Sequence, residues 1–146
     1  MIFGCLAGGR ISDAMNRKAA YALAGVVLAL FAAAMSFVPQ TPTTYAALCL
    51  GYTFVTGACY GAFTGFVLEA IGAGAAATKY NTFASLSNFP IWYMTQVDGW
   101  AADRMGPAKM LLVDAAAGAA GVVILLGVVA LVARLSQGPK PSLLAG

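Results

Sequence analysis

Five polar or aromatic side chains recur at helical spacing in the uncharged segment 80–97. They follow one another at steps of four, three, four and four residues, so a helix places them on one face. We call this set the polar stripe: Asn81, Ser85, Asn88, Trp92 and Gln96. Amide groups in hydrocarbon cost free energy unless they are hydrogen-bonded or hydrated. The spacing therefore predicts either a water-filled cavity that a substrate could follow, or a helix–helix interface.

A second polar face lies in the segment 45–70, where Thr56 and Tyr60 are spaced to share one side of a helix with Thr53 and Thr64. Beside that face runs a glycine ladder, which consists of Gly57, Gly61 and Gly65. Glycines at this spacing allow another helix backbone to approach closely. Two interpretations stay open, namely helix packing and a polar lining in which Thr56 and Tyr60 contact a substrate.

Two acidic residues lie within or near apolar segments. Glu69 is close to one end of the segment 45–70, and Asp114 is about one turn into the segment 110–133. Acids inside a membrane are candidates for proton or substrate coupling. Both also lie near the expected membrane surface, where hydration or pairing with a neighbouring basic residue is the alternative.

Several kinds of chemistry are excluded by the residue content. The chain has no histidine, and its cysteines, Cys5, Cys49 and Cys59, have no metal-binding or redox spacing. We expect all three cysteines to be small, reduced, buried residues. The sequence has no nucleophile elbow, and its net charge of +3 is too small to bind nucleic acid. We therefore expect neither an enzyme nor a bound metal or cofactor.

The composition defines the elements that must position these residues. Hydrophobic residues make up 61% of the 146 residues and charged residues 9%, so lipid must surround much of the chain. A span needs roughly 20 apolar residues. The sequence predicts an all-α membrane protein whose transmembrane domain, 19–134, has four helices. Their expected ranges are 19–38, 45–70, 80–97 and 110–133. Pro39 and Pro42 separate the first two, and a charged loop at 98–109 joins the last two. A segment at 1–18 that contains a cytoplasmic loop precedes the spans, and a mobile cytoplasmic tail at 135–146 follows them.

The basic residues predict the orientation. If the four segments all span, six of the eight Lys and Arg residues fall on one side of the membrane. Only Arg104 and Lys109 fall on the other side. Because cytoplasmic loops carry an excess of basic residues, this distribution predicts that both termini are cytoplasmic.

A motif precedes the first predicted span. The segment 8–18 has the sequence GGRISDAMNRK and resembles the loop signature G-x-x-x-D-[RK]-x-G-[RK]-[RK] of the major facilitator superfamily. Gly9, Asp13, Arg17 and Lys18 match the signature, whereas Ala14 and Asn16 depart from it. In the family, the weaker copy of this motif lies in the cytoplasmic loop after the eighth helix. The resemblance implies that the glycine allows two helix ends to approach closely, and that the aspartate caps a helix or pairs with an arginine. It also implies that this cluster of interactions forms in one conformation of the transporter and breaks in the other.

Two further segments resemble the same superfamily. The sequence GWAADRMG at 99–106 repeats the G-x-x-x-D-R-x-G form through Gly99, Asp103 and Arg104. The segment 76–88, AATKYNTFASLSN, is similar to the start of the eleventh helix in bacterial muropeptide permeases and related acetyl-CoA transporters.

The resemblance implies the last third of a twelve-helix carrier, with residues 1–9 as the end of its eighth helix. Such a carrier would be a secondary transporter of a small organic solute in a bacterial inner membrane, driven by protons and incomplete without its N-terminal helices. We do not expect the chain to transport alone. The alternative is a small stand-alone four-helix membrane protein that acts as a partner or assembly subunit.

The predicted topology can be tested with reporter fusions. Fusions after Gln40 and Met105 should report a periplasmic location, and fusions after Gly74 and Gln137 a cytoplasmic one, because the basic residues gather on the latter side. Alkaline phosphatase and green fluorescent protein activities measure the two locations. A cytoplasmic signal at Gln40 would contradict the four-span arrangement.

Overall fold

The computed structural model of the chain describes residues 1–39, 41–72, 74 and 76–136. The described residues form five α-helices: α1 (Ile2–Ala14), α2 (Arg17–Phe37), α3 (Pro42–Ile71), α4 (Ala76–Met105) and α5 (Pro107–Ser136). Most of the predicted tail at 135–146 lies outside the described residues. The all-α prediction is therefore confirmed for the part of the chain that is described.

Three helices, α2, α3 and α5, are long and apolar enough to cross a membrane, which indicates membrane association. Helix α4 is as long as α3 and α5, with 30 residues, but it does not belong to this group. Its uncharged part carries the polar stripe, which lowers its hydropathy. Three of the four predicted spans thus have a suitable helix, and the span at 80–97 stays a prediction.

Side-chain caps fix where two helices begin. Asn16 accepts hydrogen bonds from the amides of Lys18 (3.0 Å) and Ala19 (3.3 Å), so α2 begins earlier than the predicted residue 19. Thr41 caps α3 by accepting from the Thr44 amide at 3.3 Å, with a proline in the first turn, so α3 begins before the predicted residue 45. The cap of α2 is Asn16, not the motif aspartate Asp13.

Two predicted loops are largely helical. Helix α1 continues to Ala14, so most of the predicted motif loop belongs to a helix. Helix α4 continues to Met105, through the segment 98–105 that we expected to be a charged loop. Charged residues do not end a helix by themselves. The break comes at Gly106, where φ is +85°, followed at once by Pro107, which starts α5.

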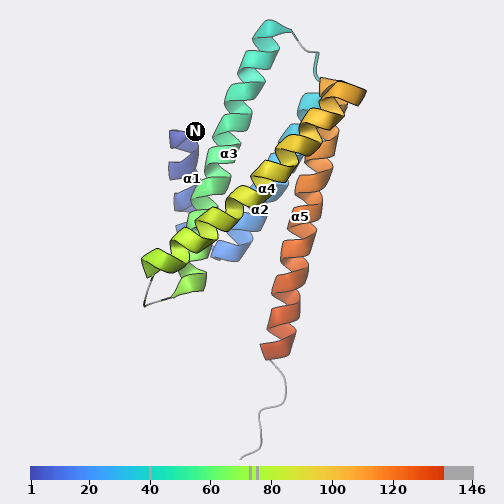
Figure 1. Cartoon of the computed structure of the whole chain (residues 1–146). Coiled ribbons are helices and arrows are strands. Elements are labelled where there is room, and N and C mark those ends of the chain that lie inside the picture. Colours follow the sequence, from blue (N-terminus) through green and yellow to red (C-terminus); the bar gives the residue numbers. More distant parts are fainter. Residues whose placement is uncertain (40, 73, 75, 137–146) are drawn as a thin grey trace, which may run out of the picture.

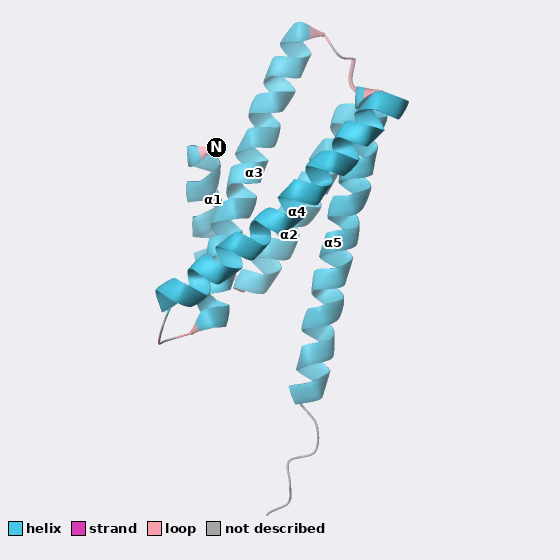
Figure 2. Ribbon diagram, viewed as in Figure 1, coloured by secondary structure: helices cyan, strands magenta, loops and turns pink. Residues whose placement is uncertain are grey.

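The helices run up and down, with successive connections at opposite ends (Figure 1). The α2–α3 and α4–α5 connections lie at the upper end, and the α1–α2 and α3–α4 connections at the lower end (Figure 2). Helix α1 packs mainly on α3, α2 packs on both α3 and α5, and α4 crosses in front and packs chiefly on α5. Helix α4 is therefore the least covered of the long helices in this bundle.

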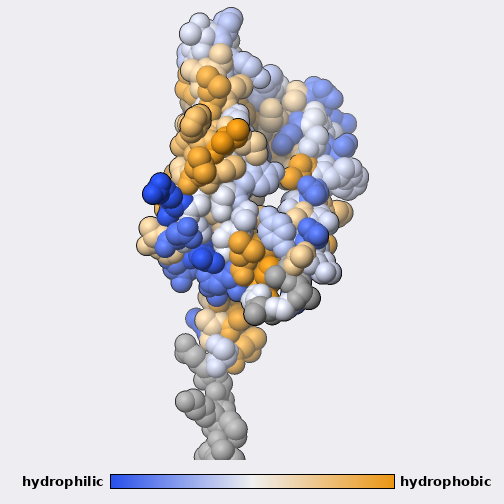
Figure 3. All heavy atoms as spheres, turned by 90° about the vertical axis from the view of Figure 1, so that its left-hand side faces the viewer, coloured by the Kyte–Doolittle hydropathy of each residue, from blue (hydrophilic) through white to orange (hydrophobic). Residues whose placement is uncertain are grey.

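Helix contacts depend on small residues, and large apolar side chains lie outside. The buried residues are mostly alanines and glycines, whereas Val123, Ile124 and Leu135 on α5 are each about two-thirds exposed, at 70%, 66% and 72%. Figure 3 shows extensive hydrophobic surface, with hydrophilic atoms gathered at the side where α4 lies and near the lower end. An apolar exterior around a small-residue interior is the pattern expected of helices that lipid surrounds.

The contact between α1 and α3 is the closest in the fold. A Cβ atom added at Gly8 would collide with the backbone of Ala58, and one at Gly61 would collide with the Cys5 carbonyl. Gly4 and Gly57 face the opposite helix in the same way. Gly57 and Gly61 of the glycine ladder therefore pack against the backbone of α1, as their spacing predicted, whereas Gly65 meets the Ser12 side chain.

Replacing Gly8 by alanine should destabilise the protein by about 1–3 kcal/mol, because the added methyl group overpacks the α1–α3 contact. Gly9→Ala is the matched control, since a Cβ there meets nothing within 4 Å, and it should be neutral or slightly stabilising. Denaturation in detergent, followed by circular dichroism, measures both variants. Equal stability of the two variants would contradict this packing.

Candidate functional site

All five residues of the polar stripe are exposed, on the face of α4 that the other described helices leave uncovered. Asn88 donates to the carbonyl of Ala84 at 3.2 Å, one turn earlier in the same helix. The Trp92 ring lies 5.9 Å from that of Phe89 and is 62% exposed. The stripe is thus continuous on one side of α4, as the spacing predicted. Its partner, whether water or protein, stays a prediction.

The inner side of α4 borders a cavity of about 390 Å³ between α2, α3 and α4. Thr56 and Tyr60 line it, together with Ser87 and Ile91 of α4. The structure therefore brings the two candidates of α3 to the face of α4 opposite to the polar stripe. Ile91, which the helical period places outside the polar stripe, lies against this cavity.

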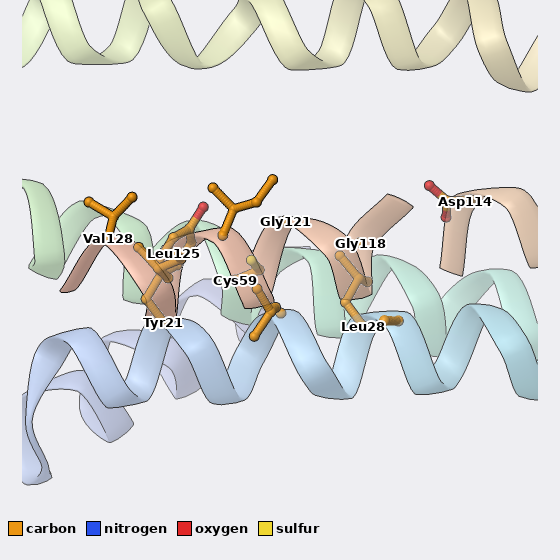
Figure 4. A pocket seen from close by; sticks show the side chains of 12 residues that line it. Tyr21, Leu28, Cys59, Asp114, Gly118, Gly121, Leu125 and Val128 are labelled. Carbon is orange, nitrogen blue, oxygen red and sulfur yellow. The ribbon is translucent and has the colours of Figure 1, made fainter. Parts of the chain in front are cut away.

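A second cavity, of about 490 Å³, lies between α2 and α5 with α3 behind it (Figure 4). Its lining is mostly apolar, with Tyr21 and Val128 towards one end and Asp114 at the other. Tyr21, Leu28 and Cys59 line both cavities, so the two cavities are neighbours.

Asp114 accepts a hydrogen bond from the hydroxyl group of Tyr52, with 3.0 Å between the oxygen atoms. The Tyr52 ring in turn lies 6.5 Å from that of Phe31 on α2, so three helices meet at this point. We had weighed proton coupling against hydration or a basic partner for Asp114, and the observed partner is a tyrosine. The sequence analysis missed Tyr52, although its spacing of four from Thr56 places it on the same side of α3.

Glu69 and the N-terminal motif come together at the other end of the bundle. Arg17 lies 3.7 Å from Asp13 and 3.9 Å from Glu69, and it donates to the carbonyl of Gly65 at 3.3 Å. One guanidinium group therefore connects α1, α2 and α3. Of the two interpretations of Glu69, the structure favours pairing with a basic residue, which is Arg17. The other motif residue, Lys18, is exposed.

The backbone nitrogen of Gly9 lies against Gly61 of α3, but the absence of a side chain at Gly9 is not what permits this close contact. A side chain at Gly9 would meet open space, whereas Gly8 lies directly against α3. The glycine that permits the close contact is therefore one residue earlier than the resemblance suggested.

The second motif lies on the last turns of α4. Gly99, Asp103 and Arg104 are exposed, and the Arg104 guanidinium lies 5.4 Å from the centre of the Trp100 ring. This is a cation–π contact near one end of the helix. The motif therefore does not form a cluster like that around Arg17.

Comparisons with known proteins assign no family or function to the chain. No protein-family model, curated protein or solved structure matches the chain significantly. Within the described ranges, no group of three or more His, Cys, Asp or Glu side chains could hold a metal ion.

Replacing Arg17 by glutamine should loosen the lower end of the bundle, because two carboxylates lose their common cationic partner and the Gly65 carbonyl loses a donor. The pairs are partly solvated, so the expected loss is roughly 0.5–1 kcal/mol, and it should shrink at high salt. Lys18→Gln, which removes the same charge from the next position, should have little effect. Unfolding midpoints in detergent at low and high salt distinguish the two. Equal losses would contradict a specific role for Arg17.

Proposed function

We propose that the chain is the C-terminal part of a secondary solute carrier of the major facilitator type, located in a bacterial inner membrane with both termini cytoplasmic. Helices α2 to α5 correspond to its ninth to twelfth helices. The carrier moves a small organic solute, with muropeptide-like compounds as one candidate class, and is coupled to protons. The observation that carries this proposal is the uncovered polar stripe on α4.

The polar stripe needs hydrogen-bond partners that the described helices of this chain do not supply. Its two asparagines, glutamine and serine are exposed on a helix of a bundle whose other long helices are apolar. An amide that faces hydrocarbon without partners costs several kcal/mol, on the order of 2–7. The stripe must therefore face water or further polar protein. In carriers of this type the solute path runs between two helical halves, and that arrangement supplies both.

The cavity on the inner side of α4 also supports a carrier. Its volume of about 390 Å³ lies within the usual range for small-molecule sites, roughly 300–1,000 Å³. Hydroxyl groups of Thr56, Tyr60 and Ser87 are among its lining, next to aromatic rings. Pro90 also lines this cavity, and a proline in a helix frees the backbone carbonyl one turn earlier.

The second candidate function is a stand-alone membrane subunit that binds another protein. The same uncovered stripe favours it, because amide and tryptophan side chains also suit a helix–helix interface. The two functions differ in whether water reaches the stripe in the assembled protein.

Thiol labelling separates these functions. Single cysteines at Trp92 and Val123, in a variant without native cysteines, are matched because the two side chains are 62% and 70% exposed in this chain. In cells expressing the gene's complete product, a membrane-impermeant thiol reagent should modify position 92 but not position 123, since only the stripe faces water. A cysteine at Asn88 should behave like the one at Trp92. Equal labelling of both faces, or an inert stripe, would contradict the carrier proposal, and the inert stripe would favour the subunit.

A further inference from the structure

The α4–α5 hairpin brings two acidic residues to the same level. The turn is at Gly106, and Asp98 precedes it by eight residues while Asp114 follows it by eight. At 1.5 Å per residue, each acid is roughly 12 Å from the turn along its helix. Because the two helices are antiparallel and in contact, this register places the two acids at the same level of the α4–α5 contact. The sequence analysis placed Asp98 in a loop and so missed this pairing.

The two carboxylates differ in their hydrogen bonding. Asp114 Oδ2 has a donor, the Tyr52 hydroxyl, at 3.0 Å. Asp98 Oδ1 is fully enclosed and has no hydrogen-bond partner. An enclosed carboxylate oxygen without a donor costs free energy when the group is charged, and far less when the group carries a proton. The enclosed oxygen therefore favours the protonated form of the Asp98 carboxyl group.

No basic side chain forms an ion pair with either acid among the described residues. On α2, the titratable residues are Arg17, Lys18 and Tyr21, all in its first two turns, at the opposite end of the bundle. Helix α3 contributes Tyr52 and, one to two turns further, Cys59. The charged residues nearer the turn, Asp103, Arg104 and Lys109, are exposed.

Burial, and after it the neighbouring carboxylate of Asp114, raise the pKa of the Asp98 carboxyl above its ordinary value. A raised pKa agrees with the enclosed, unpartnered Oδ1 of Asp98. When the pH rises through the midpoint of Asp98, a second negative charge forms beside Asp114, so the contact between α4 and α5 weakens at high pH.

We propose that Asp98, Asp114 and Tyr52 form a proton-binding site in which Asp98 carries the proton and Asp114 holds the Tyr52 hydroxyl. The proton is taken from water and returned to water, and no other bond changes. Asp114 lines the 490 Å³ cavity, and Tyr52 lines a third cavity of about 270 Å³ near the upper end of α3 and α5. The Tyr52–Asp114 bond thus lies between two cavities. A role in driving transport rests on the proposed carrier function, but proton binding is a property of this chain alone.

The test is a pH titration of the whole chain in lipid nanodiscs, with ¹³C-labelled aspartate carboxyl groups observed by nuclear magnetic resonance. The chain has four aspartates, and asparagine variants assign each signal. The midpoint of Asp98 should lie above the ordinary aspartate range. Asp114→Asn should lower that midpoint, because a like charge is removed. Asp103→Asn, which removes an exposed charge from the same helix, should leave it unchanged.

Two results would overturn the site: an ordinary midpoint for Asp98 in the unmodified chain, or equal responses to Asp114→Asn and Asp103→Asn. The first needs only a signal assignment, so it stands even if a variant folds poorly. Circular dichroism checks the folding of each variant. An ordinary midpoint for Asp98 would not affect the thiol-labelling result. An unlabelled polar stripe would not affect the Asp98 titration, so the two proposals can fail independently.

Discussion

The fold depends on one constraint, namely that apolar helices surrounded by lipid gain nothing from burying apolar side chains against each other. They associate instead through close packing of small residues. Gly8 and Gly61 satisfy this constraint where α1 meets α3, because each faces backbone atoms of the other helix. Alanines do the same along α2 and α5, where Ala20, Ala32 and Ala115 are buried. Large side chains are left to face outward.

The same constraint decides where polar groups can lie. Several hydroxyl groups on the apolar helices donate to carbonyls of their own helix, as Thr56 does to the carbonyl of Tyr52 at 2.8 Å and Thr64 to that of Tyr60 at 3.0 Å. Asp114 and Arg17 have partners on other helices, and each connects elements far apart in the chain. The polar stripe of α4 has no such arrangement of its own. The stripe makes α4 the functional helix of the proposed carrier, because among the described residues its side chains have only one hydrogen bond, from Asn88 to the Ala84 carbonyl of the same helix.

Sequence reasoning was strongest where one physical signal dominates. Uncharged segments bounded by Pro39 and Pro42 predicted helices that match α2 and α3 apart from their caps. Sequence reasoning was weakest where a helix carries charged residues. Asp98 lies on a turn of α4 that hydropathy alone cannot distinguish from a loop. The Tyr52–Asp114 bond joins residues 62 apart, and spacing along the chain does not reveal which helices are neighbours. The polar stripe itself was predictable, since it needs only the period of a helix.

The central claim is that the uncovered face of α4 belongs to a larger carrier. The mass of the polypeptide that contains this sequence in its native membranes tests it most directly. An antibody against the end of α5 would detect the protein on a denaturing gel, calibrated with the purified chain of 14.9 kDa. The account predicts a band well above 14.9 kDa, from a polypeptide with additional helices before α1. A band at 14.9 kDa and none above it would contradict the account.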